Sequence, residues 1–300
     1  MKRRSFIRLS GASLLASLSS KVFARKVEMP EVGLFLGPFK EMLAAQPMQT
    51  LETIQKAGIR DLELFDILLL ARLQPALSGM GFKINTSHFA SPFITGNWAP
   101  MQAFGMRIPP ASYTFNEVVN DAVKFGLTHL VFPYIFPEDR GGLGDYQRLA
   151  EKLNQAGESC QKAGIQLCFH PHAYDFQPME DSSPMQVILS ETNPELLKLE
   201  VDTFWLSLAG VDPAAFIRDH TARIRLAHLA DIKAGTPKIL HSVTLPPSTY
   251  QPPGKGSLDF VAIKEALQQA KIAQAYLDLE NVPNPLEALS ESLAHLSKGQ

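Results

Sequence analysis

The chain has 300 residues, of which 45% are hydrophobic, 19% charged and 9% aromatic. This composition is that of a folded globular protein, and it excludes a disordered chain, a collagen and a coiled coil. With 28 Lys and Arg against 30 Asp and Glu, the formal net charge is −2, so the chain lacks the basic excess of proteins that bind nucleic acid. Its 2 cysteines, Cys160 and Cys168, are too few for a disulfide framework, and we expect two buried, reduced thiols.

Residues 1–24 have the composition of an export signal. A basic start is followed by a short apolar stretch, which is too short to span a bilayer, and by a small-residue end at Ala24. Arg3 and Arg4, followed by Ser-Phe-Ile, resemble the twin-arginine export motif. We therefore expect a signal peptide over 1–24, a single domain over 25–300, a periplasmic location and no stable membrane anchor. The alternative is a basic amphipathic helix that stays attached.

After residue 30, short apolar runs alternate with stretches of helical pattern. The runs that predict strands are Val32–Leu36, Leu62–Phe65, Phe82–His88, Thr128–Pro133, Ile165–Phe169, Leu197–Val201, Ile224–His228 and Ala275–Leu279. Strands that alternate with helices indicate a parallel sheet of the α/β class. Eight of them favour a single (β/α)8 TIM barrel over an open doubly wound sheet. No G-x-G-x-x-G follows a strand, so nothing supports a dinucleotide site.

Polar side chains gather where the predicted strands end, which is the end that forms the active site in barrels of this type. They are Glu63, His88, His170, His172, Asp175, Asp202, His228, Asp231, Lys233, Asp278 and Glu280. Any one of them could be a hydrogen-bonded structural residue, but carboxylates or imidazoles follow four successive strands. Acids combined with one imidazole suit a divalent ion such as Mn²⁺, Mg²⁺, Co²⁺ or Zn²⁺. Such an ion polarises a substrate carbonyl and stabilises an enediolate, while a nearby carboxylate moves the proton.

Residues 31–297 resemble the sugar phosphate isomerase/epimerase family, which has the xylose isomerase-like barrel. The segments that carry the resemblance lie in the family's order and spacing. Residues 50–65 are similar to its "G-x-x-x-V-E-L-F" strand, 153–176 to "LN-x-x-G…AGI…YHNH-x-x-EF", 199–213 to "LD-T-x-W…G-x-DP", 223–233 to "RI-x-x-x-H-x-K-D", and 254–260 to "G-x-G-x-ID-F".

The resemblance implies a divalent metal held by Asp202, His228, Glu280 and one group from the fifth strand. We prefer Asp175 for that group, with His170 as the alternative, because Asp175 stands where the family has Glu. Asp278 is the alternative to Glu280. Asp175 and Glu280 would also serve as the catalytic acid and base.

The resemblance further implies a set of substrate contacts, namely Glu63, His88, His170, His172 and Lys233. The lysine of the family's "H-x-K-D" is Ala230 here, so Lys233 either replaces it or is solvated.

The function implied is a metal-dependent isomerase or epimerase that removes a proton next to the metal-bound carbonyl of a sugar or keto-sugar. The alternatives are a lyase or hydratase acting on 3-keto-glycosides and a non-catalytic sugar-binding barrel. The expected partner is a small-molecule carbohydrate and not nucleic acid, and export makes a phosphorylated sugar the less favoured choice. The loop at 91–111 either covers the site or packs against a second subunit, which leaves a homo-oligomer open.

Overall fold

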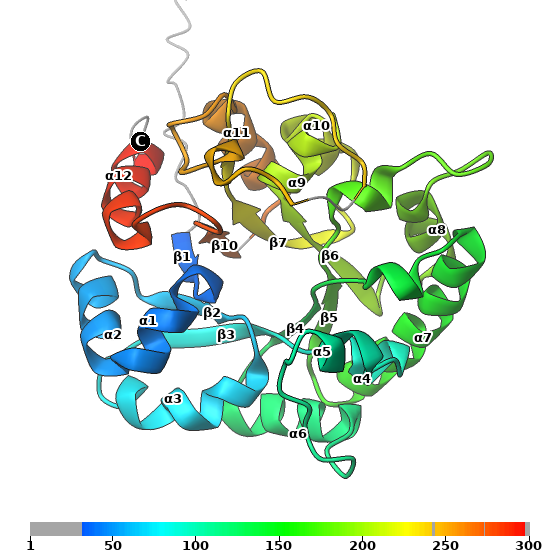
Figure 1. Cartoon of the computed structure of the whole chain (residues 1–300), viewed down its shortest axis with the longest axis horizontal. Helices are drawn as coiled ribbons and strands as arrows, with labels where there is room; N and C mark the ends of the chain where they lie inside the picture. The colour runs from blue at the N-terminus through cyan, green and yellow to red at the C-terminus, as the bar shows by residue number, and fades with distance from the viewer. Residues whose placement is uncertain (1–31, 242–243, 273, 298–300) are drawn as a thin grey trace, which may run out of the picture.

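The computed structural model describes residues 32–241, 244–272 and 274–297, so the expected signal peptide lies outside the described residues. Eight parallel strands close into a barrel in the order β1-β10-β7-β6-β5-β4-β3-β2 (Figure 1). They are β1 (Val32–Phe35), β2 (Asp61–Leu64), β3 (Lys83–His88), β4 (His129–Phe132), β5 (Gln166–Phe169), β6 (Leu197–Asp202), β7 (Ile224–Leu229) and β10 (Gln274–Leu277). Each predicted apolar run overlaps one of these strands, so the predicted barrel is confirmed.

Helices surround the barrel (Figure 1). They are α1 (Lys40–Ala45), α2 (Pro47–Lys56), α3 (Leu70–Leu77), α4 (Pro92–Thr95), α5 (Ala99–Ala103), α6 (Phe115–Phe125), α7 (Leu143–Lys162), α8 (Pro184–Glu191), α9 (Thr203–Leu208), α10 (Pro213–Asp219), α11 (Phe260–Gln269) and α12 (Pro285–Ser297). A small antiparallel ribbon of β8 (Asp231–Ile232) and β9 (Tyr250–Gln251) follows β7. Local sequence sets the helix ends: Thr114 and Glu117 form a capping box before α6, and Gly126 ends it at φ 74°.

The interior of the barrel is layered. Phe35, Val131, Cys168, Leu226 and Tyr276 form one buried apolar cluster inside it. Because side chains alternate along a strand, the residues two positions further on point the same way. On β5, β7 and β10 that step leads from these apolar side chains to His170, His228 and Asp278. The polar layer therefore rests on an apolar floor.

Two strands change their pairing register where a glutamate enters the barrel. The register of β2 against β3 shifts between Leu62 and Glu63, and that of β6 against β7 shifts between Leu199 and Glu200. Such irregularities occur next to active sites, where they re-aim a side chain. Both glutamates are fully buried, with 0% exposure. Strand pairing is thus irregular at the two points where a glutamate side chain enters the barrel interior.

Cys160 and Cys168 are both buried and are not joined in a disulfide, which confirms the expectation of two reduced thiols. Among the described residues, no helix is long and apolar enough to cross a membrane.

Candidate metal centre and adjoining pocket

Two aspartates at the strand ends each use one oxygen to accept backbone hydrogen bonds, and the other oxygen of each lies 3.8 Å from Nδ1 of His228. Oδ1 of Asp202 caps α9 by accepting hydrogen bonds from the backbone N–H groups of Phe204 at 2.7 Å and Trp205 at 3.2 Å. Oδ1 of Asp278 accepts one from the N–H of Glu280 at 2.8 Å. The backbone thereby fixes both carboxylates, and Oδ2 of Asp202 is buried without a hydrogen-bond partner.

Two histidines are arranged in a similar way, because one nitrogen of each ring is hydrogen-bonded to a buried glutamate. Nε2 of His228 lies 2.5 Å from Oε2 of Glu63, and Nδ1 of His170 lies 2.9 Å from Oε2 of Glu200. The other nitrogen of each ring faces Asp202: its Oδ2 lies 3.8 Å from Nδ1 of His228 and 4.0 Å from Nε2 of His170. Nδ1 of His228 is buried and has no hydrogen-bond partner.

Asp202, His228 and Asp278 bring ligand atoms within 4.8 Å of one another, and Oδ2 of Asp278 lies 3.8 Å from Nδ1 of His228. His170 lies beside this group, with its Nε2 4.0 Å from Oδ2 of Asp202. Two imidazoles and two carboxylates suit Mn²⁺, Co²⁺ or Zn²⁺. Unpartnered buried polar atoms are costly, and here Asp202 and His228 point two of them at each other. The residues present thus fit a divalent ion, and the glutamates behind the histidines are the outer partners that such ligands usually have.

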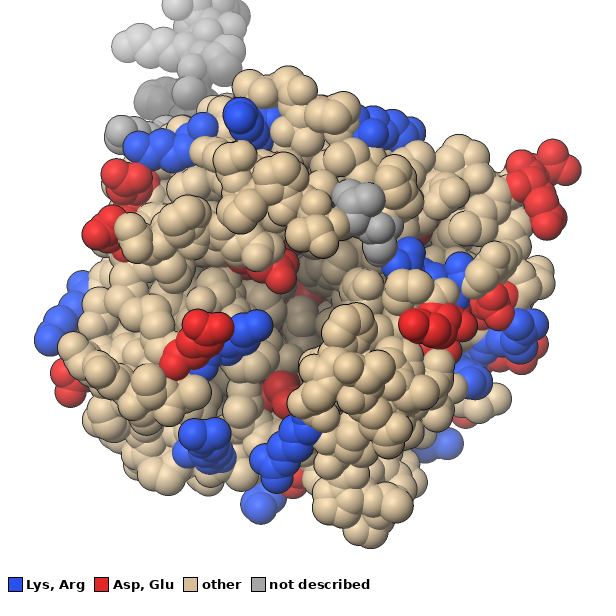
Figure 2. All heavy atoms as spheres, in the orientation of Figure 1, with Lys and Arg blue, Asp and Glu red and all other residues tan. Residues whose placement is uncertain are grey.

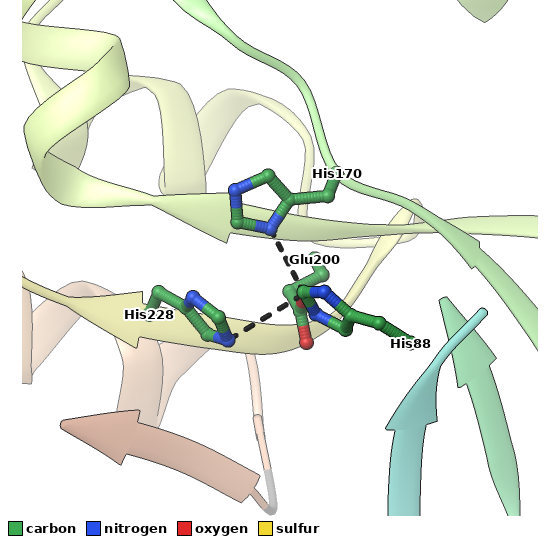
Figure 3. Close-up of side chains that lie close together, drawn as sticks. All are labelled: His88, His170, Glu200 and His228. Carbon is green, nitrogen blue, oxygen red and sulfur yellow. Dashed lines mark hydrogen bonds and ion pairs between the residues drawn. The ribbon is translucent and has the colours of Figure 1, made fainter. Parts of the chain in front are cut away.

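Beneath this group, Glu200 receives three imidazoles (Figure 3). Its Oε2 lies 2.9 Å from Nδ1 of His170, 3.0 Å from Nε2 of His88 and 3.5 Å from Nε2 of His228. Burial opposes ionisation of Glu200, but the facing imidazoles lower its pKa well below the usual value. The pKa of Glu63 is raised because of burial and because of the charge of Glu200. One buried anion thus orients three rings.

The charges around Asp202, His228 and Asp278 favour a bound cation. Burial raises the pKa of Asp202 to about 6. Burial and the charges of Glu280 and Asp202 raise the pKa of Asp278 well above its usual value. Burial lowers the pKa of His228 to about 3, so this ring is neutral and able to donate a lone pair to a metal. A bound divalent ion would relieve the repulsion between the acids.

Asp175, the preferred ligand from the fifth strand, is occupied elsewhere. It is fully buried. Its Oδ1 accepts the hydroxyl of Tyr146 at 3.0 Å, and its Oδ2 accepts the N–H of His172 at 2.8 Å. Burial raises the pKa of Asp175 to about 7. The structure therefore places His170, the alternative ligand, beside Asp202, while Asp175 anchors the loop that follows β5.

Glu280, the preferred ligand from the eighth strand, lies one step beyond Asp278 at the rim. It is exposed, and it lines a pocket of about 500 Å³. Asp278 takes the position next to His228 that we had assigned to Glu280. The space-filling view shows a hollow at the centre of this face, in which Asp and Glu atoms are visible (Figure 2).

The expected substrate contacts divide into three groups. His172 lines the pocket. Glu63, His88 and His170 are at most 6% exposed and belong to the buried network under the pocket. Lys233 is exposed and is not among the described residues that line the pocket. Its neighbour Asp231 is structural, because its carboxylate accepts five backbone N–H groups from Ile232, Gly254, Gly256, Ser257 and Leu258.

Glu200 is a functional candidate that the sequence analysis missed. The signal was present, because Glu200 stands two residues before Asp202 within an apolar strand and hence on the same inward face. The aromatic pocket residues Tyr134, Trp205 and Tyr250 were also not singled out, since aromatic residues in loops are most often packing residues.

The family model described as "Xylose isomerase-like TIM barrel" matches residues 114–299, more than half of the chain. The chain belongs to the xylose isomerase-like TIM barrel family. Among curated relatives, an inosose dehydratase of Geobacillus kaustophilus is 27% identical over 125 residues, which cover 40% of this chain and 40% of that protein. The match thus spans less than half of the relative's length.

Solved structures of the same fold cover nearly the whole chain. A sugar phosphate isomerase/epimerase from Parabacteroides distasonis superposes with a TM-score of 0.70 at 18% identity, covering 91% of this chain and 96% of that one. A 3-keto-D-glucoside 4-epimerase from E. coli superposes with a TM-score of 0.60 at 16% identity, covering 90% and 99%. At these identities the likeness establishes the fold.

Proposed function

We propose that this protein is a divalent-metal-dependent enzyme that moves a proton on the carbon next to the carbonyl group of a sugar or keto-sugar, as an isomerase or epimerase. The observation that carries the proposal is the pair of unpartnered atoms, Oδ2 of Asp202 and Nδ1 of His228, which face each other at 3.8 Å. His170 and Asp278 would complete the metal site. The names of the curated and solved relatives support a sugar-like substrate.

When bound, a divalent ion would act as a Lewis acid that makes the hydrogen next to a carbonyl more acidic. Glu280 would remove that proton; its position in the lining of the pocket, next to Asp278, supports this role. Although Glu280 is open to the pocket, partial desolvation by its surroundings raises the pKa of its carboxyl group, which makes its carboxylate a stronger base. His172 also lines the pocket. Burial and the charge of His170 lower its pKa well below the usual value, so its neutral ring can accept or relay a proton.

The experiment is metal analysis together with proton exchange. Purified protein, dialysed after incubation with Mn²⁺, should retain one equivalent of metal and should incorporate deuterium next to the carbonyl of a keto-sugar in heavy water. The variant Asp202→Ala/His228→Ala should lose both properties. Asp212→Ala/His220→Ala is the matched control, since Asp212 caps α10 as Asp202 caps α9. Equal metal content in the two double variants would overturn the site. Metal-free protein that still binds sugar would favour the non-catalytic barrel.

A lyase or hydratase acting on 3-keto-glycosides is the second candidate, and one feature of the site favours it. An epimerase needs proton-transfer groups on opposite faces of the carbon, whereas an elimination can remove the proton and protonate the leaving oxygen from one face. Both oxygens of Asp175 are engaged, so Glu280 is the carboxylate left to face the pocket. The curated relatives reported above are named dehydratases. An unsaturated product absorbing in the ultraviolet would identify elimination.

We also propose that residues 1–24 direct export to the periplasm by the twin-arginine route. The motif Arg3-Arg4-Ser5-Phe6-Ile7 supports it. The double variant Arg3→Lys/Arg4→Lys should accumulate in the cytoplasm with its N-terminus intact, while the wild-type protein should appear in the periplasm beginning at Arg25. Cytoplasmic retention of the wild-type chain would contradict the proposal. Size-exclusion chromatography with light scattering would test whether the exported protein forms a homo-oligomer.

A further inference from the structure

Aromatic rings form most of the pocket wall next to the candidate metal site. Phe104, Tyr134, Phe136, Tyr174, Trp205 and Tyr250 line it together with His172. These rings come from α9, β9 and the loops after α5, β4 and β5, five separate parts of the chain. Aromatic faces carry partial negative charge, whereas the axial C–H groups on the flat face of a pyranose and the edge C–H groups of a phenyl ring carry partial positive charge. The pocket therefore suits a flat, uncharged ring.

The rings are held in place by one another. Tyr134 meets His172 at 82° with ring centres 5.3 Å apart, and it meets Tyr174 at 88°. The ring centre of Trp205 lies 4.7 Å from that of His172, and Trp205 meets Tyr250 at 84°. Edge-to-face pairs of this kind are favourable and restrict ring rotation. The pocket is thus largely formed before a ligand enters, which lowers the entropy lost on binding.

One further ring lies open at the mouth of the pocket. Phe104 is 73% exposed and stacks beside Phe136 at 6.5 Å between ring centres. A large exposed aromatic side chain at the edge of an apolar concavity is typical of a ligand contact. It extends the apolar wall outward, away from the buried metal ligands.

The pocket and the metal ligands are connected. A narrow hollow lined by Asp202 and Asp278 adjoins the pocket, and Glu280, Trp205 and Tyr250 line both spaces. The pocket volume of about 500 Å³ falls in the range of roughly 300–1,000 Å³ that holds drug-sized ligands. A lone sugar ring beside the metal ligands would leave much of this space unfilled.

Charge argues against a phosphate in the pocket. Among the described residues that line it, none is Lys or Arg, and Glu280 contributes a carboxylate. The nearby guanidinium of Arg140 stacks on the Tyr174 ring, 3.6 Å from its centre, and Arg140 is not among the described residues that line the pocket. Phosphate recognition generally uses Arg, Lys or a helix N-terminus. A neutral group fits these walls better.

We propose that this aromatic pocket is a second subsite, which binds the uncharged ring attached to the reacting sugar, either a second sugar unit or an aromatic aglycone. The inference rests on the proposed function, in that it takes the metal site as the place of the reacting sugar. It assigns the substrate to the class of glycosides rather than free or phosphorylated monosaccharides. The ring would stack on Trp205 or Tyr134, which both line the pocket.

Isothermal titration of the full chain with four probes tests the subsite: methyl β-D-glucoside, phenyl β-D-glucoside, cellobiose and glucose 6-phosphate. We expect the phenyl glucoside, cellobiose or both to bind about tenfold more tightly than the methyl glucoside, a change that one aromatic contact with its buried area can supply. A gain for the phenyl glucoside alone identifies an aromatic aglycone, and a gain for cellobiose identifies a second sugar. Equal affinity of all three glycosides, or tightest binding of glucose 6-phosphate, overturns the proposal.

Variants locate the effect. Trp205→Ala, in α9, and Tyr134→Ala, in the loop after β4, should remove the tenfold preference and leave the metal content unchanged. Trp98→Ala is the matched control, because Trp98 packs on Phe93 at 5.0 Å and is not among the described lining residues. A preference that survives in both pocket variants overturns the subsite. Normal metal content without any preference refutes the subsite alone, whereas a preference in protein that holds no metal refutes the proposed function alone.

Discussion

Nε2 of His228 lies 2.5 Å from Oε2 of Glu63, across the barrel from a residue 165 positions away in the sequence. For Nδ1 of His228 to hold a metal, Nε2 must carry the proton and donate it to Glu63. The glutamate thereby fixes both the tautomer and the orientation of the ring. Glu200 does the same for His170 through Nδ1. In the candidate metal site, the proposed ligands therefore rest on two glutamates, Glu63 and Glu200, which are fully buried.

Removing Glu63 should weaken metal binding although Glu63 does not touch the metal. We expect Glu63→Ala to lower the affinity for Mn²⁺ by about 10- to 100-fold, the usual effect of losing such an outer partner. Glu63→Gln keeps an oxygen that accepts from Nε2, so it should restore most of the affinity. Competition with a chelating dye measures both. Equal affinity of wild type and Glu63→Ala would show that the hydrogen bond does not orient the ligand.

Asp278 and Glu280, the two acids that follow β10, should have different roles: Asp278 in metal binding and Glu280 in proton transfer. Asp278→Asn should lose bound metal, because Oδ2 of Asp278 faces Nδ1 of His228 at 3.8 Å. Glu280→Gln should retain metal and lower the rate of deuterium incorporation by about 10²- to 10⁴-fold, the typical contribution of a general base. Metal content by mass spectrometry and exchange by NMR give the two readouts. Metal loss in Glu280→Gln with retention in Asp278→Asn would restore Glu280 as the ligand.

Metal affinity should fall as the pH is lowered through about 6. Burial raises the pKa of Asp202 in the metal-free protein to about 6, so below that pH a proton competes with the ion. Well below pH 6 the affinity should drop at least about tenfold per pH unit, because Asp278 and His170, whose pKa values are also raised, add competing protons. His228 adds no competition there, because burial lowers its pKa to about 3. Titrations at pH 5 and pH 7 that give the same affinity would contradict the assignment of Asp202.

The sequence predicted the scaffold better than it predicted the site. Parallel barrel strands are buried on both faces and read as apolar runs, so all eight were found. Asp202 and His228 were placed correctly at the strand ends. After β5 and after β10, two candidate ligands lie close together in the sequence: His170 or Asp175, and Asp278 or Glu280. Choosing between them requires the direction of each side chain, which the sequence does not give. The hydroxyl of Tyr146, on α7, occupies one oxygen of Asp175 from 29 residues away in the sequence. No local sequence pattern predicts that contact.

Glu200 illustrates the same limit. It lies inside β6, where a glutamate looks like an exception to an apolar strand. Its role becomes clear only from the three imidazoles that face it, which come from β3, β7 and the end of β5. A buried carboxylate is tolerable only with such partners. The register shift just before Glu200 could not be seen in the sequence either, because bulges follow from pairing with a neighbouring strand.

Asp175 should make stability depend on pH. Burial raises its pKa from 3.8 to about 7, so between these values the folded protein binds more protons than the unfolded chain. The contribution of Asp175 is complete below pH 3.8 and is lost as the pH rises through 7, at up to about 1.4 kcal/mol per unit. Asp175→Asn should therefore gain stability relative to wild type as the pH rises from 4 to 7. Asp181→Asn, on the surface, should stay parallel to wild type in urea denaturation, and a parallel Asp175→Asn profile would contradict the shift.

Asp231 should contribute more to the stability of the fold than a typical surface carboxylate. Its Oδ1 accepts N–H groups from Ile232, Ser257 and Leu258, and its Oδ2 accepts those of Gly254 and Gly256, at 2.8–3.0 Å. An amide at this position retains one acceptor oxygen and turns N–H groups toward the donors on its other side. Asp231→Asn should therefore lower the free energy of unfolding by several kcal/mol, since each charge-assisted hydrogen bond contributes about 1.5–3 kcal/mol.

Asp259 supplies the matched control for this prediction. It caps α11 through one oxygen only, which accepts from Val261 and Ala262 at 3.0 Å. Asp259→Asn keeps that oxygen, so it should cost less than about 1 kcal/mol, as expected when one good capping residue replaces another. Urea denaturation of the two variants measures the difference. Similar losses in both would mean that the loop at 254–258 is held by contacts other than the Asp231 carboxylate.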